Sequence, residues 1–381
     1  MNFEFTQQQL EDRAFYAQFA QQEIMPYLRQ MDEEEATPPC VLKAMQTPRI
    51  LGIPLSTEYG GFGRDFVTAT ICMEELSKVS PATAGIINVS TEVVGMGLYN
   101  YGTEEQKRKY LTRIASGEAI GAFALTEPGA GSDSAGVQTT ANLVGDEYVL
   151  NGTKMFITNA EISDIFLIAA KADMGDGSRK ITMFIVEKET PGFSIGSHEH
   201  KMGIRSSSTC ELVFDNCRIP KENLLGQLGK GLKIALSGLD GGRVMIATQG
   251  LGIAQSCIDH TVSFLKEHAA ETNYLLNEQN TQFTLAKLQT KVDAARLLCY
   301  RAAAKWDSGA RFSQEAAMAK YYATDLANEV ARECIQLMGY QGLSQSYQLE
   351  SFFRDAKITE IYEGTNEIQL LVLSGLLDYK I

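Results

Sequence analysis

The period of the hydrophobic pattern changes twice along this 381-residue chain. Apolar residues recur at helical spacing up to about residue 118 and again from about residue 229, whereas runs such as 165–171 and 181–188 are typical of strands. The length also exceeds what one ordinary core organises. We therefore predict a multidomain α+β chain with an N-terminal α-helical domain (1–118), a middle β domain (119–227) and a C-terminal four-helix-bundle domain (228–381).

Local signals support this division. Thr6 and Thr103 each begin a capping box, which predicts that a helix starts there. Asn151-Gly152 stands between two short apolar runs and predicts a hairpin. Several strands at this spacing indicate a small antiparallel β-barrel or sandwich in the middle of the chain.

The last third of the chain carries two long helical patterns. One follows an apolar seam, and the other spans about Gln314 to Met338 and ends at Gly339. The seam consists of Leu285, Leu288, Val292, Ala295, Cys299, Ala302 and Trp306. Such seams pack against other helices, so we expect a bundle.

Composition excludes several classes of function. A net charge of -13 argues against a nucleic-acid surface. The seven cysteines are scattered without a C-x-x-C pair, and His198 and His200 form a lone H-x-H, so we predict free thiols and no metal site. The apolar runs are shorter than the ~20 residues of a membrane span, so no membrane insertion is expected. No targeting segment is apparent, and we expect a cytoplasmic protein.

The stretch Ile361–Gln369 places Glu363 directly before Gly364 and Thr365. A carboxylate on a loop beside a buried cleft can have its pKa raised into the range of a general base. Glu363 could equally be an exposed acid near the start of a helix, where the dipole favours it. These nine residues alone leave both interpretations open.

The stretch Phe123–Asp133 contains a turn of Pro, Gly and Ser. Its backbone amides, with the hydroxyls of Thr126 and Ser132, could bind carbonyls, ribityl hydroxyls or phosphates. A tight turn that needs glycine for its dihedral angles is the alternative. On the following predicted strand, Phe156 and Thr158 would share one face and could meet a planar cofactor, or Phe156 could belong to the core.

The stretch Leu239–Arg243 puts Gly241 and Gly242 beside Arg243 near the start of a helix. Glycine costs a helix about 1 kcal/mol relative to alanine, so we expect a group that needs room beside the backbone. Arg243 could pair with an anionic group of a ligand or form an ordinary salt bridge.

Together these stretches resemble the acyl-CoA dehydrogenase family. The segments are FALTEPGAGSD (123–133), NGTKMFITN (151–159), LDGGR (239–243) and RDAKITEIYEGTNEIQ (354–369), in the family's order and spacing. The resemblance covers essentially the whole chain. LDGGR with YEGTNEIQ most resembles the short-chain, butyryl-type branch.

The resemblance implies FAD bound between the β domain and the C-terminal bundle. It implies α,β-dehydrogenation of a short-chain acyl thioester to the trans-2-enoyl thioester, with the α-proton taken by Glu363 and the hydride passed to flavin N5. The ribityl 2'-hydroxyl and the amide of Glu363 would bind the thioester carbonyl. Some branches place the base just before the LDGGR arginine, but Gly242 stands there, which leaves Glu363.

The same resemblance assigns further roles. Besides Glu363 as catalytic base, it implies cofactor contacts from Phe123, Leu125, Thr126, Ser132, Phe156, Thr158, Gln279, Gln336, Gly339, Thr365 and Glu367, and substrate contacts from Ser132, Asp240, Arg243, Tyr362 and Gly364. It implies electron-transfer flavoprotein as acceptor and a homotetramer, or a dimer.

The chain departs from the family pattern at the adenosine and pyrophosphate end of the cofactor. His268, Glu271 and Thr272 stand in place of an R-x-x-F-G segment, and Tyr340 replaces a second glycine after Gly339. We therefore hypothesise weaker FAD binding than is usual in the family.

Two alternatives remain open at this stage. The substrate could be an acyl or aminoacyl thioester on a carrier protein, with oxygen as acceptor, as in natural-product pathways. A non-catalytic relative that has lost functional FAD binding is the third interpretation. Acyl chain length and branching do not follow from the sequence.

Overall fold

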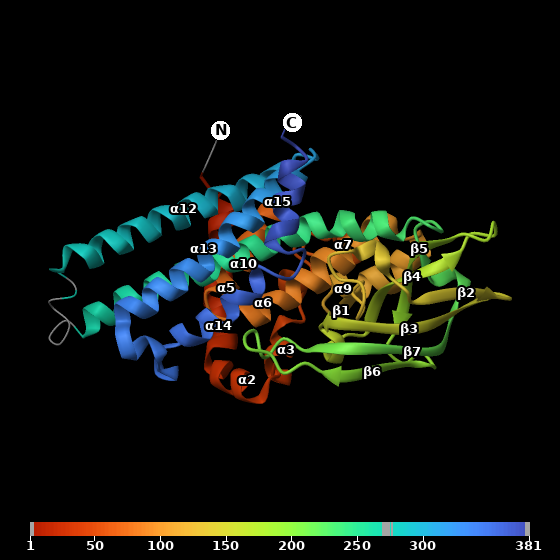
Figure 1. Cartoon of the computed structure of the whole chain (residues 1–381), viewed down its shortest axis with the longest axis horizontal. Helices are drawn as coiled ribbons and strands as arrows, with labels where there is room; N and C mark the ends of the chain where they lie inside the picture. Colours follow the sequence, from red (N-terminus) through yellow and green to blue (C-terminus); the bar gives the residue numbers. More distant parts are fainter. Residues whose placement is uncertain (1–3, 269–274, 276, 378–381) are drawn as a thin grey trace.

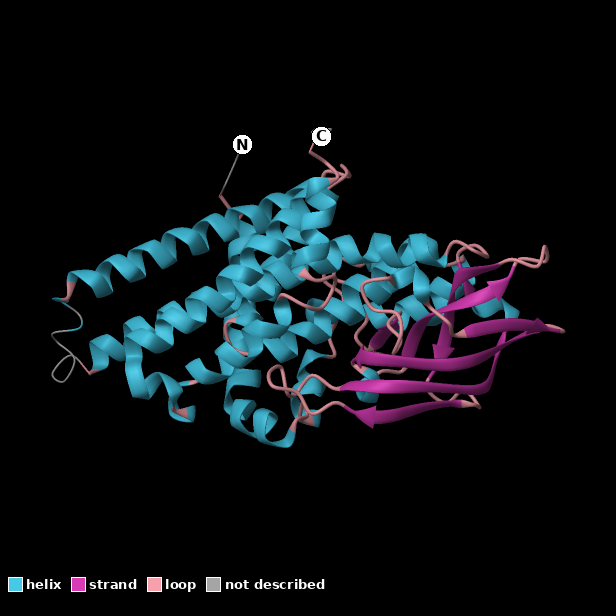
Figure 2. Ribbon diagram, viewed as in Figure 1, coloured by secondary structure: helices cyan, strands magenta, loops and turns pink. Residues whose placement is uncertain are grey.

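The computed structural model describes residues 4–268, 275 and 277–377. The strands gather at one end of an elongated molecule, and helices from both ends of the chain fill the rest (Figures 1 and 2). The predicted multidomain α+β fold is confirmed. Its first part is helical, its middle is a β-sheet unit, and its last part is helical again.

The N-terminal part consists of short helices, several of them π or 3-10 segments. They are α1 Gln7–Phe19, η1 Ala20–Ile24, η2 Met25–Tyr27, α2 Leu28–Glu34, α3 Pro39–Met45, α4 Pro48–Leu51, η3 Thr57–Tyr59, α5 Phe66–Ser77, α6 Pro81–Ile87, η4 Asn88–Gly95, α7 Met96–Tyr101, α8 Glu104–Gln106, η5 Lys107–Leu111 and α9 Thr112–Ala115. Both predicted capping boxes form, at Thr6 before α1 and at Thr103 before α8.

The middle part forms one eight-stranded sheet with the order β6-β7-β3-β2-β4-β5-β8, and β1 pairs with β4. The strands are β1 Gly121–Ala124, β2 Thr140–Val144, β3 Glu147–Thr158, β4 Ile165–Asp173, β5 Arg179–Glu187, β6 Phe193–His198, β7 Thr209–Pro220 and β8 Leu224–Leu225, with 3-10 turns η6 Ser134–Gly136, η7 Ala160–Ile162 and η8 Lys221–Asn223. Most pairs are antiparallel, but β1–β4 and β2–β4 are parallel, which the sequence did not predict.

The prediction of a hairpin at Asn151-Gly152 is wrong. These residues lie inside the continuous strand β3, at a shift of its register against β7. Gly152 has φ 145°, and a Cβ there would come within 2.6 Å of the Thr139 hydroxyl oxygen. Asn151 accepts a hydrogen bond from the backbone of Asn216. The pair thus forms a β-bulge, which shares with a tight turn its need for glycine.

The C-terminal part is built on three long helices, α10 Gly231–Glu267, α12 Gln279–Asp307 and α13 Ser313–Met338. The shorter α14 Leu349–Thr359 and α15 Asn366–Ser374 follow after the 3-10 turns η9 Gly339–Leu343 and η10 Gln345–Tyr347. Most of the predicted seam on α12 is buried, and α13 ends at Gly339 with φ 63°. Among the described residues, the predicted bundle therefore has three long helices, and its fourth member, α14, is short.

Helix α10 runs through the middle of the molecule and contributes to three cores, the first of them through Ile234 and Ala235. Val244 and Met245 pack with the N-terminal helices, while Leu251 to Leu265 pack with α12, α13 and α14. Because one rigid helix joins these cores, the side chains on its N-terminal half have fixed positions relative to the sheet and to α14.

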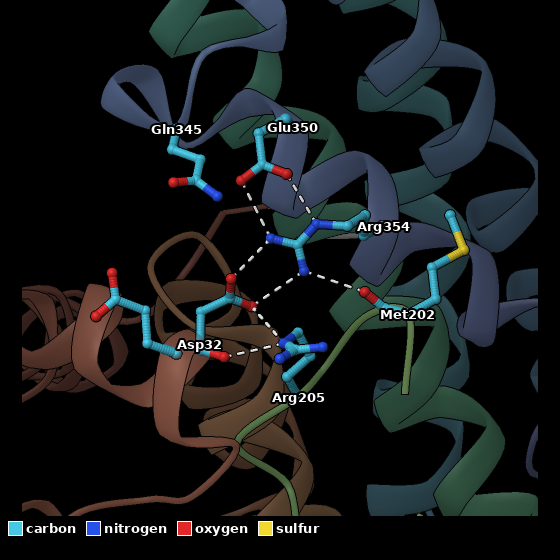
Figure 3. A pocket seen from close by; sticks show the side chains of 7 residues that line it. Asp32, Met202, Arg205, Gln345, Glu350 and Arg354 are labelled. Atoms are coloured by element: carbon cyan, nitrogen blue, oxygen red, sulfur yellow. Dashed lines mark hydrogen bonds and ion pairs between the residues drawn. The ribbon is translucent and has the colours of Figure 1, made fainter. Parts of the chain in front are cut away.

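A network of charges also links the three parts of the chain (Figure 3). Arg354 on α14 binds Asp32 on α2 at 2.9 Å and Glu350 at 2.8 Å. Arg205, from the segment between β6 and β7, donates to the carbonyl oxygen of Asp32 and pairs with Glu35 at 2.6 Å. This network anchors α14, the helix that leads into the Glu363 loop.

The described cysteines are all free thiols, and six of the seven are buried. Within residues 4–268, 275 and 277–377, none of the helices combines the length and apolar character that a membrane span requires.

Candidate active site

Glu363 lies in the loop between α14 and α15, where it reaches a small cavity of about 20 Å³. Glu363 and Gly364 have φ values of 54° and 88°, and such left-handed residues turn a chain sharply. The cavity is lined by Pro81, Ala82, Gly85, Asn88, Val89, Thr158, Ile204, Ser207, Ile246, Gln249, Tyr362 and Glu363. Oε2 of Glu363 is buried, which favours a general base over an exposed acid at this position.

The carboxylate of Glu363 has few partners. Burial raises its pKa to about 7, and the nearby Arg243, Asn88 and Lys320 offset part of that rise. Asn88 donates a long hydrogen bond of 3.5 Å to Oε1. Oε2 is buried and makes no hydrogen bond with any described residue. One carboxylate oxygen is thus available to accept a proton at near-neutral pH.

The two glycines of Leu239–Arg243 each make room for a different group. A Cβ on Gly241 would lie 2.5 Å from the ring of Trp306, which stacks on Phe66 with ring centroids 4.3 Å apart. A Cβ on Gly242 would lie 2.9 Å from Oε2 of Glu363. The prediction that something needs room beside this backbone is correct.

Arg243 and Asp240 lie one helical turn apart on α10 and form an ion pair of 2.7 Å. Arg243 is buried, and Asp240 also accepts a hydrogen bond from Ser313 on α13. A nitrogen of the Arg243 guanidinium lies 3.9 Å from the position that a Cβ on Gly364 would take. The arginine is therefore held beside the Glu363 loop by a salt bridge within the chain.

Lys320 on α13 supports this loop from inside the bundle. Its buried ammonium donates to the carbonyl of Glu360 and to the side chain of Asn366, both at 2.9 Å. Burial lowers the pKa of Lys320 to about 7, and Glu363 opposes that change. The sequence reasoning missed Lys320, because only the packed structure brings α13 against the Glu363 loop.

Gln249 and Tyr362 lie side by side in the wall of the cavity. Gln249 is fully buried, donates to the carbonyl of Pro81 at 2.6 Å and accepts a hydrogen bond from the Tyr362 hydroxyl. Asn88 begins the π-helical segment η4, a local change of register that is frequent at functional sites. Neither Asn88 nor Gln249 was predicted, because both come from segments distant in sequence from Glu363.

A buried ion pair holds the Phe123–Asp133 stretch against the sheet. Lys154 on β3 and Glu127 lie 2.7 Å apart, and both are almost inaccessible to solvent. Glu127 also accepts hydrogen bonds from the backbone of Thr139 and Gln138, and Lys154 donates to the carbonyl of Leu125. This leaves every charge in the pair compensated, so the turn is fixed beside Phe156.

Phe156 lies at a second bulge of β3. Its φ is 57°, and 58% of the side chain is exposed, whereas Ile157 is buried in the core of the sheet. Thr158 lies on the same side as Phe156 and lines the cavity of Glu363. The backbone amide of Met155 donates to the carbonyl of Thr126, which brings the two stretches together.

These residues fit a planar, hydroxyl-rich cofactor such as FAD. The hydroxyls of Thr126, Ser132 and Thr158 make no hydrogen bond with a described residue. Phe123 and Leu125 are half-buried, and the positions of a Cβ on Gly129 and Gly131 are open. An aromatic surface, free hydroxyls and accessible glycine backbone are what a flavin with a phosphate tail requires.

The cofactor residues implied by the resemblance fall into two groups. Thr365 caps α15 and Glu367 lies in its first turn, next to Glu363. Gln279 begins α12, while Gln336 and Gly339 end α13, and these three are exposed at the far end of the bundle. Lys320, which contacts the Glu363 loop, precedes Gln336 on α13 by 16 positions, which corresponds to about 24 Å along the helix. One chain does not bring the two groups together.

His268 directly follows α10, and its ring Nδ1 donates a hydrogen bond of 3.0 Å to the carbonyl oxygen of Phe264; Tyr340 is 79% exposed. Glu271 and Thr272 lie outside the described residues.

One group of described side chains could hold a cation. Glu161, His198 and Cys210 bring their ligand atoms within 4.8 Å of one another. His198 lies 3.3 Å from Glu161, and Glu35 pairs with both His198 and His200.

Comparison with known proteins gives matches along the whole chain. Family models described as acyl-CoA dehydrogenase N-terminal, middle and C-terminal domains match residues 6–118, 122–217 and 229–375. The short-chain specific acyl-CoA dehydrogenase of Clostridium acetobutylicum is 44% identical over 375 residues, covering 98% of this chain and 99% of the relative.

Two solved structures are similar over nearly their full length. Butyryl-CoA dehydrogenase from Megasphaera elsdenii has a TM-score of 0.95 and 39% identity, and the match covers 99% of both chains. A chain in the structure of the electron transferring flavoprotein of Acidaminococcus fermentans has a TM-score of 0.96 and 42% identity, with 100% of both chains covered.

Proposed function

This chain belongs to the acyl-CoA dehydrogenase family, and from that premise we propose that it oxidises a short-chain acyl-CoA with Glu363 as the catalytic base. It is an FAD-dependent acyl-CoA dehydrogenase, an oxidoreductase that forms a double bond between Cα and Cβ. The observation that carries the proposed role is the buried carboxylate of Glu363, with one oxygen free of partners beside the cavity.

Removal of the α-proton is the difficult step of this reaction, because a hydrogen next to a thioester carbonyl is very weakly acidic. Oε2 of Glu363 is the acceptor that we assign, and the raised pKa matches a base that works near neutral pH. The backbone amide of Glu363 makes no hydrogen bond with a described residue, so it can bind the thioester carbonyl as negative charge develops there. Bound FAD supplies the acceptor for the hydride that leaves Cβ.

The preference for a short acyl chain is supported by Gln249 and Tyr362. Their hydrogen bond places two polar groups in the cavity wall, and Gln249 is fixed a second time by Pro81. A longer chain would have to displace buried, hydrogen-bonded groups, which costs about 1 to 3 kcal/mol for each group left without a partner.

We further propose that the flavin contacts Phe123, Leu125, Thr126, Phe156 and Thr158. The stretch 123–126 meets the bulge of β3 through the hydrogen bonds from Lys154 to the carbonyl of Leu125 and from the amide of Met155 to the carbonyl of Thr126. Ser132, Thr365 and Glu367 are proposed for the rest of the cofactor in the same chain, and Asp240, Arg243, Tyr362 and Gly364 for the substrate.

Gln279, Gln336 and Gly339 lie too far away to join this set within one chain. We therefore propose that they contact the cofactor of a second copy, which makes the protein a homodimer or a homotetramer. We also propose that the chain divides into three domains, which comprise residues 1–118, 119–227 and 228–381. As electron acceptor we propose an electron-transfer flavoprotein.

The direct test is addition of butyryl-, hexanoyl- or octanoyl-CoA to the purified protein without oxygen. Bleaching of the flavin absorbance by butyryl-CoA, with weaker effects of the longer esters, is the expected result. If none of the three bleaches the flavin, the proposed function is wrong.

A further inference from the structure

Three side chains that can bind a metal ion meet at the edge of the sheet where β6 leads into β7. Glu161 lies in the turn η7, His198 ends β6 and Cys210 lies near the start of β7. Their ligand atoms all lie within 4.8 Å of one another. The sequence showed His198 only as part of a lone H-x-H, because its two neighbours in space are distant from it in the chain.

The ligand atoms are spaced nearly as in a tetrahedral site. Nδ1 of His198 lies 3.3 Å from Oε2 of Glu161 and 3.9 Å from Sγ of Cys210. Zinc forms bonds of about 2.0 Å to nitrogen and oxygen and about 2.3 Å to sulfur, which places neighbouring ligand atoms about 3.3 to 3.6 Å apart. The side chain of Glu161 is 46% exposed, so its carboxylate can make the remaining movement toward the sulfur at little cost.

The other ring nitrogen of His198 is a second, independent sign of a ligand. Nε2 is buried and makes no hydrogen bond with a described residue, and Oε2 of Glu35 lies 3.8 Å from it. A histidine that binds a metal through one ring nitrogen usually donates the N–H of the other to a carboxylate. When Nδ1 binds a metal, Nε2 carries the proton, and a small tilt of the ring brings that N–H to Glu35. Arg205 fixes the other oxygen of Glu35 at 2.6 Å.

The backbone holds these side chains in place. The amide of Glu161 donates a hydrogen bond of 3.4 Å to the hydroxyl of Ser208, which fixes η7 against the segment that leads into β7. Cys210 pairs in register with Ile157 of the sheet core. Its thiol therefore lies on the face of the sheet opposite to Phe156, and the group is separate from the residues proposed for the flavin.

The charges of the group suit a divalent cation. One thiolate and one carboxylate neutralise two positive charges, and a neutral imidazole adds none. The charge of Glu35 is compensated by Arg205. The ammonium of Lys201 interacts electrostatically with Glu161 and Cys210 and repels a cation, so the group should bind a metal less tightly than a site with four protein ligands does.

We propose that Glu161, His198 and Cys210 form a zinc site, with water as the fourth ligand and Glu35 as the hydrogen-bond acceptor of the histidine. Binding forms one bond from each ligand atom to Zn²⁺, and the proton of the thiol passes to the solvent. Sulfur and nitrogen ligands favour zinc over calcium and magnesium, which take oxygen ligands. The metal joins β6, β7 and η7 and, through Glu35, links the sheet to the N-terminal helices. This inference does not depend on the proposed function.

The test uses the purified protein with its FAD, freed of metal by a chelator and then dialysed against Zn²⁺ or Co²⁺. Bound Co²⁺ gives a sulfur-to-cobalt charge-transfer band only when a thiolate is a ligand, and its weaker bands lie in the red, where oxidised flavin does not absorb. We expect one metal ion per chain, the charge-transfer band with Co²⁺, and a higher Tm with Zn²⁺ than without it. Wild-type protein that binds neither ion, or that binds Co²⁺ without the band, overturns the inference.

Variants of the ligands assign the site. Glu35→Gln should weaken Zn²⁺ binding by about ten- to a hundredfold and keep the charge-transfer band, because it changes only the partner of the histidine. Cys210→Ser and Glu161→Gln should each weaken binding by more than that, and Cys210→Ser should also remove the band. Because Glu161 is exposed, Glu161→Gln keeps the test valid if the buried cysteine cannot be replaced without loss of folding.

Cys217→Ser is the matched control. Cys217 is also a buried free thiol on β7, but it does not belong to the group of metal-binding side chains found among the described residues. Its replacement should leave the metal affinity and the charge-transfer band unchanged. Zn²⁺ affinities of Cys210→Ser and Glu161→Gln that equal that of this control would show that the metal binds elsewhere, and the inference would be wrong.

Discussion

A Cβ atom on Gly242 would lie 2.9 Å from Oε2 of Glu363, so the carboxylate occupies the space that a side chain at position 242 would need. The two positions therefore exclude each other sterically. Only one of them can present a side chain to the cavity, and in this chain it is 363.

Gly242→Ala should lower kcat/KM by displacing the carboxylate of Glu363. A shift of about 1 Å can cost about a hundredfold in rate, so we expect a loss of that order. Gly238→Ala is the control on the same helix, because a Cβ there meets no atom closer than 3.8 Å. Steady-state rates and FAD content of both variants should be measured. Equal activities in the two variants would contradict the steric relationship.

Glu363 should make the reaction depend on pH around neutrality. Its pKa is raised to about 7 and the base must be ionised, so kcat/KM should rise with pH through about 7 and then level off. Glu363→Gln should lower kcat/KM by about a hundredfold to ten-thousandfold and abolish the inflection while FAD stays bound. The pH–rate profile of both proteins checks this. An inflection that survives in the variant would assign the titration to another group.

Glu92 should cost the protein stability at neutral and alkaline pH. It is buried in η4, neither of its oxygens has a hydrogen-bond partner among the described residues, and burial raises its pKa to about 8. The unfolded chain loses this proton near the ordinary pKa of 4.5, so the free energy of unfolding falls as the pH rises from there to about 8. The penalty is about 1.4 kcal/mol for each unit between the two pKa values.

Glu92→Gln should therefore raise the free energy of unfolding by a few kcal/mol at about pH 8 and by much less at about pH 5. Urea unfolding at the two pH values measures the difference. A gain that is the same at both pH values would show that folding does not raise the pKa of Glu92.

This protein should bind FAD more weakly than is usual in the family. The segment from His268 to Thr272 offers no arginine, and Tyr340 stands where the family has glycine. His268→Arg should tighten FAD binding by about ten- to a hundredfold, the effect of one charged contact to a phosphate. Flavin retained after extensive dialysis is the measurement. Stoichiometric FAD in the dialysed wild type would contradict the hypothesis.

Gln249→Ala should shift substrate preference toward longer acyl chains. The change removes a buried side chain from the cavity wall and frees the hydroxyl of Tyr362. The ratio of kcat/KM for octanoyl-CoA to that for butyryl-CoA should rise about tenfold or more, within the range that a few methylenes can contribute. Thr248 is also buried on α10 but does not line the cavity, so Thr248→Ser serves as the control. Unchanged ratios in both variants would show that Gln249 does not limit the length of the acyl chain.

The local pattern of the sequence predicted most of the elements. Capping at Thr6 and Thr103, the seam on α12 and the stop at Gly339 depend on neighbouring residues, and all were found. The hairpin at Asn151-Gly152 was wrong because a bulge and a tight turn both need glycine, and only the pairing with β7 distinguishes them.

The candidate site was predicted less completely. Gly241 and Gly242 stood out because glycine is unfavourable in a helix, so the pattern indicated close approach without indicating what approached. Trp306 is 65 positions from Gly241 in the chain, and only the packed structure places its ring there. Asn88, Gln249 and Lys320 likewise act through the tertiary fold, and nothing next to them in sequence marks them.

The left-handed backbone at Glu363 has a consequence for how this protein can evolve. Glutamate is poorly suited to φ 54°, which asparagine and glycine adopt more readily, and its charge is buried there as well. Replacement by asparagine should therefore make the protein more resistant to unfolding while removing its base. Selection for stability and selection for turnover therefore favour different residues at position 363. A lineage that replaced this glutamate under selection for stability alone would retain the fold and lose the catalytic activity.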